Sequence, residues 1–232
     1  MQVALTPMTP KHLVRTSHGH FYNMSGFHQG RWFQNCMQHG VAPSSKICGA
    51  RLSLTYRLTS RTATRLGLEP VITKPLILSV REHFMAHLSF DSIFQEVSHS
   101  LEPDISFSRG MWHVNHGRLA GALMDERYWA DPNAFRYSYG KKILNGKPMG
   151  PLVREMCAAV ISATGQVMDW VHVTYYPMKQ SKLGTHSDSE PAIAYGTDIA
   201  CLTFMQHEGD ERDVYVIGND APRTSTTTTT TT

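Results

Sequence analysis

The segment 51–57, with the sequence RLSLTYR, constrains the fold most, because polar and apolar residues alternate along its whole length. A period of two predicts a strand with its apolar residues on one face and Arg51, Ser53, Thr55 and Arg57 on the other. If the polar face is turned inward, its two arginines need anionic partners, since an unpaired buried charge is very costly. A dicarboxylate would supply them through charge-assisted bonds. On an edge strand the arginines would instead face water.

A histidine and an aspartate at spacing i, i+2 indicate a metal site. In His186-Ser187-Asp188 the imidazole and the carboxylate would lie on the same side of an extended chain. A second histidine would complete a 2-His-1-carboxylate triad, which holds iron and leaves positions open for a co-substrate and oxygen. The HxD pattern alone is weak, because a polar strand end also produces it. His39, just upstream of the arginine-bearing strand, is our candidate for the third ligand; a surface position near a turn is the alternative.

The composition is that of one globular domain. The chain has 232 residues, 41% of them hydrophobic, which is enough for one sizeable core. With 18% charged residues and a net charge of +3, electrostatics alone make no case for nucleic acid, although a pI near 8.7 permits a local basic groove. We expect a soluble, intracellular protein with no membrane partner, since neither a membrane-spanning apolar run nor a signal-peptide core is present. The four cysteines form no CxxC pair, which argues against a zinc knuckle and suits a reducing compartment: Cys36, Cys48, Cys157 and Cys201.

Periodicity predicts an α+β, mainly β fold. Residues 151–161 carry one apolar stripe at helical spacing, with Pro151 in the first turn and Gly165 as a stop signal. Apolar residues also recur at helical spacing between Val80 and Leu101. Many short strands with two helices favour a β-rich domain with helices packed outside it. Five segments are predicted as strands: 20–24, 51–58, 170–176, 199–205 and 214–217.

Three blocks in the second half of the chain resemble the AlkB family of Fe(II)- and 2-oxoglutarate-dependent dioxygenases. The segments 174–176 (TYY), 186–191 (HSDSEP) and 199–204 (IACLTF) follow the order of that family's NxY, HxDxE and IxSxSxG blocks. Further upstream, 118–119 (RL) and 135–140 (FRYSYG) are similar to its PR and YxYSG segments.

The first quarter of the chain resembles the C-terminal third of the same family. That third normally has a glycine-led strand, a Q…HxV histidine and an RxNxTxR strand, which correspond here to 18–26 (HGHFYNMSG), Gln29 with His39, and 51–57. The sequences of these blocks are most similar to those of AlkB-like domains in plant RNA virus replicase polyproteins. Thr174 and Ser53 stand where the family usually has asparagine.

The order of the blocks departs from the family and predicts a circular permutation. Read from 76 to 217 and then from 13 to 58, the blocks fall into the usual order, so that residues 1–217 would form a single permuted domain. The polar stretch 60–74 would then connect the original ends, and the threonine-rich residues 218–232 would be a disordered tail. The alternative is an excised piece that contains halves of two neighbouring domains.

The resemblance implies a double-stranded β-helix (jelly roll) with flanking helices, and Fe(II) held by His186, Asp188 and His39. It implies that Arg51 clamps the distal carboxylate of 2-oxoglutarate and that Arg57 lies nearer the metal. Three further contacts to the co-substrate follow from the same blocks: Tyr176, Ser53 and Thr174. The implied reaction is oxidative demethylation of alkylated RNA or DNA, which releases succinate, CO2 and formaldehyde.

Substrate contacts are expected in two places. Glu190 matches the acidic residue that the family uses just after HxD, and Tyr137, Tyr139 and Trp129 are candidates for stacking on a flipped-out base. Ordinary packing is an equally good interpretation of each aromatic residue. Scattered cations could follow a phosphate backbone: Arg61, Arg65, Lys141, Lys142 and Lys179.

Two other functions stay open at this point. The same iron chemistry could act on a protein side chain or a small molecule, or the chain could be a catalytically inactive jelly roll that binds a partner. The oligomeric state is also open, between a monomer and a dimer in which the N-terminal arm completes the neighbouring barrel.

Overall fold

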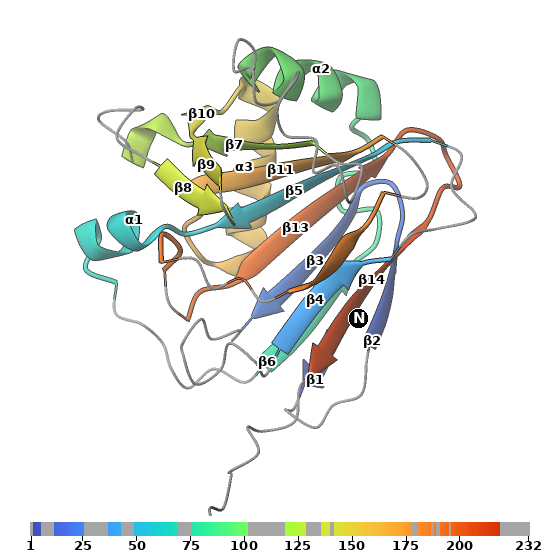
Figure 1. Ribbon diagram of the computed structural model, residues 1–232, viewed down its shortest axis with the longest axis horizontal. Coiled ribbons are helices and arrows are strands. Elements are labelled where there is room, and N and C mark those ends of the chain that lie inside the picture. Colours follow the sequence, from blue (N-terminus) through green and yellow to red (C-terminus); the bar gives the residue numbers. More distant parts are fainter. Residues whose placement is uncertain are drawn as a thin grey trace, which may run out of the picture.

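The computed structural model describes residues 2–5, 12–25, 37–42, 49–68, 76–101, 119–128, 136–139, 142–177, 181–186, 188, 191–194 and 196–218. Within them the protein is mainly β, with three α-helices, an eight-stranded sheet, a four-stranded sheet and a two-stranded hairpin (Figure 1). The threonine-rich tail lies outside the described residues. In the described part of the chain, no helix has the length and apolar content needed to cross a membrane.

The large sheet has the strand order β1-β6-β3-β13-β5-β11-β7-β10. Its central strand, β5, pairs antiparallel with β13 on one side and β11 on the other. The bounds are Gln2–Leu5 (β1), His20–Ser25 (β3), Arg51–Arg57 (β5), Leu76–Arg81 (β6), Leu119–Met124 (β7), Lys147–Pro148 (β10), Trp170–Tyr176 (β11) and Ile199–Met205 (β13).

The small sheet has the order β12-β4-β14-β2, and a separate hairpin joins β8 to β9. The bounds are His12–Thr16 (β2), Met37–Val41 (β4), Arg136–Tyr139 (β8), Lys142–Asn145 (β9), Leu183–His186 (β12) and Arg212–Gly218 (β14).

Strands that follow one another along the chain mostly alternate between the two sheets. The run β11, β12, β13, β14 goes large, small, large, small, and the run β2, β3, β4, β5 goes small, large, small, large. The two runs pair with each other, because β11 and β13 flank β5, and β12 and β14 flank β4. The end of β14 lies beside the beginning of β2, where Val216 is opposite His12. The N-terminal run β2–β5 and the C-terminal run β11–β14 therefore each contribute strands to both sheets.

Helices cover the face of the large sheet that points away from the small sheet (Figure 1). Leu52, Leu54 and Tyr56 of β5 are fully buried there, in the same core as α2 (Phe90–Leu101) and α3 (Pro151–Thr164). Helix α3 begins at Pro151 and ends at Gly165, whose φ of 69° is the left-handed C-cap conformation. The predicted helix at 151–161 and its stop signal are confirmed.

A second core fills the space between the two sheets. Valines of the small sheet, among them Val14, Val41 and Val214, pack there against Met24 and Ile199 of the large sheet. The polar face of β5 turns toward this space, and its arginines are buried, with Arg51 0% and Arg57 3% exposed. The alternation in segment 51–57 is confirmed, and its arginines face inward and not toward water.

The five predicted strands are all present, but the pattern between Val80 and Leu101 was only partly a helix. The helix begins at Phe90, whereas Val80 belongs to strand β6. Leu78 and Val80 are buried in the core between the sheets while Ser79 is half-buried, a period of two that the helical pattern obscured.

The predicted connector at 60–74 begins with a short helix, α1 (Ser60–Arg65), and residues 69–74 lie outside the described part. Thr59 is its N-cap and accepts a hydrogen bond from the Thr62 amide at 3.3 Å. The buried Asp169 accepts bonds from the hydroxyls of Thr59 (2.6 Å) and Thr62 (2.5 Å), and from the Thr59 amide. This polar anchor fixes the chain where it leaves β5.

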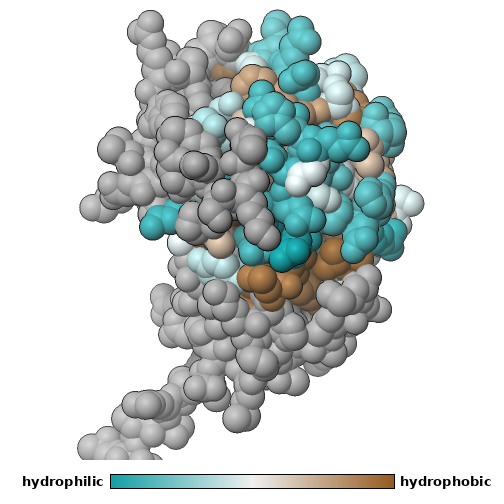
Figure 2. Space-filling view, turned by 90° about the vertical axis from the view of Figure 1, so that its right-hand side faces the viewer, coloured by the Kyte–Doolittle hydropathy of each residue, from teal (hydrophilic) through white to brown (hydrophobic). Residues whose placement is uncertain are grey.

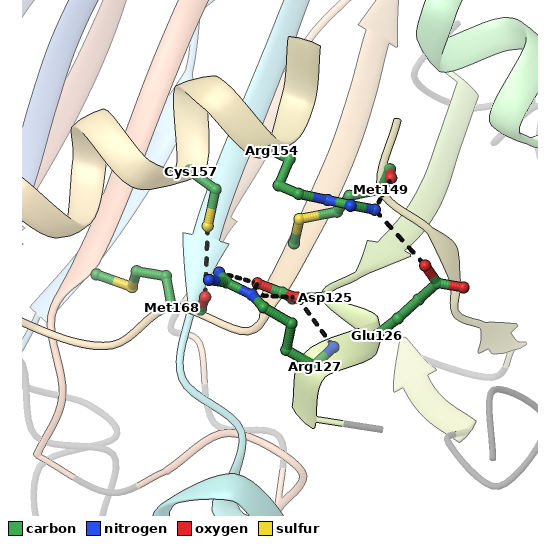
Figure 3. A network of polar contacts seen from close by, with 7 residues as sticks. All are labelled: Asp125, Glu126, Arg127, Met149, Arg154, Cys157 and Met168. Atoms are coloured by element: carbon green, nitrogen blue, oxygen red, sulfur yellow. Dashed lines mark hydrogen bonds and ion pairs between the residues drawn. The ribbon is translucent and has the colours of Figure 1, made fainter. Parts of the chain in front are cut away.

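A network of polar contacts joins the end of β7 to α3 (Figure 3). The carboxylate of Asp125 is buried and accepts two bonds of 2.9 Å from Nε of Arg127 and one from its Nη2. Arg154 of α3 donates to the Met149 carbonyl at 2.9 Å and lies 3.6 Å from Glu126.

Few large apolar side chains are exposed among the residues that the structure describes. Figure 2 shows one face, on which hydrophilic residues prevail among those coloured; hydrophobic residues are visible in the lower middle and near the top. In the described part of the chain the exposed large hydrophobic residues are Leu13, Leu66 and Leu68.

Candidate metal and co-substrate site

Two histidines from different parts of the sequence meet across the small sheet. His39 on β4 is the direct cross-strand partner of His186 at the end of β12, and their ring centroids are 4.3 Å apart. Asp188 follows two residues later, with Oδ2 3.6 Å from Nε2 of His39 and Oδ1 3.4 Å from Nε2 of His186. One potential ligand atom from each residue lies within 4.8 Å of the other two. The three side chains thus lie close enough together to hold a metal ion.

The hydrogen bonding of His186 leaves the nitrogen nearer to Asp188 suited to a cation. Its Nδ1 lies 3.0 Å from the carbonyl oxygen of Gly184, and since a carbonyl only accepts, Nδ1 carries a proton. In the neutral ring Nε2 then has a lone pair, 3.4 Å from a carboxylate oxygen. Two lone pairs at this distance repel unless a proton or a metal ion lies between them.

The protonation states suit metal binding. Burial, and next the neighbouring His186, lower the pKa of His39 to about 3, so that this ring is neutral at neutral pH. Burial alone would lower the pKa of His186, but the hydrogen bond to Asp188 and the negative charge of that carboxylate raise the pKa of His186 overall. Burial would raise the pKa of Asp188, but Arg57 and both histidines hold it well below its ordinary range. Two imidazoles and one carboxylate are a donor set that fits Fe(II).

Arg57 fixes the carboxylate of this group. Its Nη2 donates to Oδ2 of Asp188 at 2.6 Å, and both side chains are buried. A charge-assisted bond of this length restricts the rotation of the carboxylate, so Asp188 presents its oxygens toward the two histidines in a defined orientation.

A cavity between the sheets extends from the three residues. The small sheet and the loop that follows β12 line it with five residues: His39, Val41, Leu183, His186 and Asp188. The large sheet lines the remainder: Tyr22, Ser53, Thr55, Arg57, His172, Thr174 and Tyr176. The predicted co-substrate residues Ser53, Thr174, Tyr176 and Arg57 are therefore in one place. The hydroxyl of Ser53, where the family has asparagine, lies 3.0 Å from Sγ of Cys201.

Arg51 lies behind Tyr176 and is incompletely paired. Its guanidinium carbon is 5.1 Å from the centre of the Tyr176 ring, and its Nη2 donates to Thr203 at 3.2 Å. Its Nε and Nη1 are buried and have no hydrogen-bond partner within the described residues. A fully buried guanidinium with two open donors fits an anionic ligand, and a carboxylate would satisfy both donors at once.

The predicted substrate residues are not brought into this site by the described structure. Glu190 and Trp129 lie outside the described residues. Tyr137 and Tyr139 are on β8, where only the backbone is described. Of the candidate cations, Arg65 donates to the Tyr128 carbonyl at 3.0 Å, Arg61 is exposed, and only the backbone of Lys142 is described. Lys141 and Lys179 are outside the described part.

Three residues of the site were not singled out from the sequence. His172 and Tyr22 line the cavity, and Arg212 lies near it over Tyr176. The signal for His172 was present, because it is in phase with Thr174 and Tyr176 on β11. For Arg212 a comparable signal exists in its period-two spacing with Val214 and Val216, both buried.

Comparison with known proteins gives limited support for the resemblance. No protein-family model and no solved structure matches the chain. Among curated proteins it is similar to the DNA oxidative demethylase ALKBH2 of Bos taurus, with 27% identity over 115 residues. The match covers 49% of this chain and 40% of the relative's length. Over about half of its length, then, the chain is similar to an AlkB-type demethylase.

Proposed function

We propose that this chain is an Fe(II)- and 2-oxoglutarate-dependent dioxygenase of the AlkB type that demethylates alkylated RNA or DNA. The observation that carries the proposal is the convergence of His39, His186 and Asp188, with ligand atoms within 4.8 Å of one another. The similarity to a DNA oxidative demethylase supports a methylated nucleic acid as the substrate.

The co-substrate would lie between the metal ligands and Arg51. Arg51 would bind the distal carboxylate with its two open donors, and Tyr176, which lines the cavity beside it, would contribute its hydroxyl group. Ser53 and Thr174 would contribute hydroxyls in place of the asparagines of the family. Arg57, bonded to Asp188, lies nearest to the metal ligands.

His39, His186 and Asp188 would hold the metal ion. When bound, Fe(II) with 2-oxoglutarate and O2 supplies the oxidation of an N-methyl group, with succinate, CO2 and formaldehyde as products. The chain itself would contribute a neutral His39, a carboxylate oriented by Arg57, and a site between two sheets from which most water is excluded.

The fold would be a double-stranded β-helix in permuted order. The alternation of strands between two sheets supports it, as does the position of Val216 beside His12, where an unpermuted chain would run on from β14 into β2. Residues 1–217 would then form one domain, in which 13–58 correspond to the family's C-terminal third and 76–217 to the rest, with 60–74 as connector.

Residues other than the three metal ligands would contact the methylated base. Glu190 would bind it after HxD, and Tyr137, Tyr139 and Trp129 would stack on it, roles that follow from the sequence blocks alone.

Formaldehyde release from methylated oligonucleotides tests the function. The purified chain is incubated with Fe(II), 2-oxoglutarate and single-stranded RNA or DNA that carries N-methylated bases, and formaldehyde and the restored base are measured. Unmethylated oligonucleotides and the Asp188→Ala variant are the controls. Formaldehyde from methylated strands only, absent in Asp188→Ala, is the expected result. Succinate without formaldehyde would favour a protein or small-molecule substrate, and neither product would favour an inactive binding module.

A further inference from the structure

A second arginine lies beside the candidate co-substrate pocket. Arg212 begins β14, and it shares the inward face of the small sheet with Val214 and Val216. It is 1% exposed, although arginine is rarely so deeply buried. Its Nη1 donates to the carbonyl of Ser181 at 2.5 Å, and Thr16 donates to its backbone carbonyl at 2.8 Å. One bond thus holds the guanidinium group and the other holds the backbone of Arg212.

Both buried arginines lie over the same ring. The guanidinium carbons of Arg51 and Arg212 are 5.1 Å and 5.5 Å from the centre of the Tyr176 ring, which is 1% exposed. Tyr176 lines the cavity that reaches the metal ligands. The three residues come from β5, β14 and β11, so both sheets contribute to this end of the pocket.

Positive charge gathers at this end in the described part of the chain. Burial, and next the charge of Arg51, lower the pKa of Arg212 to about 10, while the buried carboxylate of Asp210 acts in the opposite direction. Asp210 also accepts a bond from the Gly49 amide at 2.9 Å. Among the described residues here, two guanidinium groups lie near one carboxylate, and an anionic ligand would be favourable beside them.

We propose that Arg212 is a positioning residue for the distal carboxylate of the co-substrate: it fixes the ring of Tyr176 and adds a second positive charge beside Arg51. This inference rests on the proposed function. It predicts that Arg212 contributes to the binding of a 2-oxo dicarboxylate and contributes nothing to a 2-oxo monocarboxylate, because only the dicarboxylate reaches this end of the pocket.

Binding of two 2-oxo acids separates this role from a structural one. The full chain with Mn(II) is titrated by calorimetry with 2-oxoglutarate and with 2-oxobutyrate, which lacks the distal carboxylate. Arg212→Met removes the charge at similar length, Arg212→Lys keeps it, and Arg15→Met is the control. Arg15 is on the adjacent strand and is exposed, with ion pairs to Glu211 and Asp213. Thermal unfolding of each variant is recorded in parallel.

We expect Arg212→Met to weaken 2-oxoglutarate binding by about tenfold or more, the loss typical of a removed ionic partner. Binding of 2-oxobutyrate should stay within about twofold, Arg212→Lys should recover most of the affinity, and Arg15→Met should change neither. Equal weakening of both acids, or unchanged 2-oxoglutarate binding, overturns the proposal.

Two further outcomes are distinguishable. If Arg212→Met does not fold, Arg212→Gln takes its place: it removes the charge but keeps hydrogen-bonding groups, so it should weaken the binding of 2-oxoglutarate and leave that of 2-oxobutyrate unchanged. Unchanged 2-oxoglutarate affinity in Arg212→Gln would overturn the role. If the unaltered chain binds no 2-oxoglutarate, the proposed function itself fails, and this inference falls with it.

Discussion

His39 and His186 are direct cross-strand partners in the antiparallel pair β4–β12, with ring centroids 4.3 Å apart. One belongs to the first run of strands and the other to the second, so the pairing of the two runs creates the candidate metal site. A shift of one residue in this register would move His39 to the opposite face of its strand, where Gly40 now lies against the ring of Tyr215. The site therefore depends on the register between segments that are far apart in the sequence.

Replacing Arg51 by methionine should separate stability from co-substrate binding. Affinity for 2-oxoglutarate should fall by about 10- to 100-fold, which corresponds to the roughly 1.5–3 kcal/mol of a hydrogen bond to a charged group. The free energy of unfolding without ligand should be unchanged or higher, because an incompletely paired buried cation is replaced by an apolar chain of similar volume. Calorimetry and urea denaturation measure the two effects. Unaltered 2-oxoglutarate affinity would show that Arg51 has no part in the pocket.

The ion pair at Asp125 should make stability depend on acid pH. Burial raises the pKa of Asp125, but the bonds from Arg127 outweigh it and hold the pKa below its ordinary value. A lowered pKa in the folded state stabilises the fold above the unfolded pKa of about 3.9, and this contribution is lost as the pH falls through the folded pKa. Asp125→Asn should therefore cost about 1 kcal/mol at pH 7, because Arg127 is largely exposed, and almost nothing at the acid end.

Urea denaturation at pH 7, 5 and about 3 checks this dependence, with Glu208→Gln, an exposed carboxylate in the turn before β14, as control. A difference between wild type and Asp125→Asn that stays constant down to the lowest pH would exclude the ion pair as its cause.

Glu96 of α2 should stabilise the start of α3. Its two carboxylate oxygens accept bonds from the Leu152 amide (2.9 Å) and the Val153 amide (2.8 Å), which have no partner within the helix. Glu96→Ala should lower the free energy of unfolding by about 1–2 kcal/mol. Gln95→Ala, an exposed change on the same helix, should have little effect.

Gly150 offers a test of this cap by coupling. A Cβ at Gly150 would lie 2.5 Å from Cδ of Glu96, so Gly150→Ala should displace the carboxylate. In the Glu96→Ala background the same change should cost much less. Additive effects of the two substitutions would contradict the cap.

The sequence predicted those parts of the candidate site that depend on the spacing of residues within one strand. The period of two in β5 placed Arg51 and Arg57 on an inward face, and the spacing of His186 and Asp188 placed both on one side of the chain. His39 was a candidate because it lies just upstream of β5, and the resemblance implied the same ligand. Its pairing with His186 across the small sheet was not predicted, because neither segment alone determines a long-range register. The period of two places Arg212 on the inward face of β14 with Val214 and Val216, but its position over Tyr176 is evident only in the folded chain. The boundary between β6 and α2 was missed because buried strand residues such as Val80 also fit a helical spacing.

We expect the chain to be active as a monomer. In that case the strand pairs that build the candidate site, such as β4 with β12 and β5 with β11, form within a single copy. Sedimentation velocity combined with turnover over a range of concentrations should show a monomer with constant specific activity. Activity confined to a dimer and lost on dilution would mean that the arm up to residue 58 completes the site of a neighbour.

We expect His39, His186 and Asp188 to hold one iron ion, and the conversion of 2-oxoglutarate to succinate depends on that ion. Succinate is measured after incubation of the purified chain with Fe(II) and 2-oxoglutarate, for wild type, His39→Ala and the exposed control His207→Ala. We predict Fe(II)-dependent succinate from wild type and from His207→Ala, and a loss of at least about 100-fold in His39→Ala, because a first-row metal is held poorly by two remaining ligands. Undiminished succinate production by His39→Ala would contradict the account, since the iron would then be held without the strand that brings His39 to it.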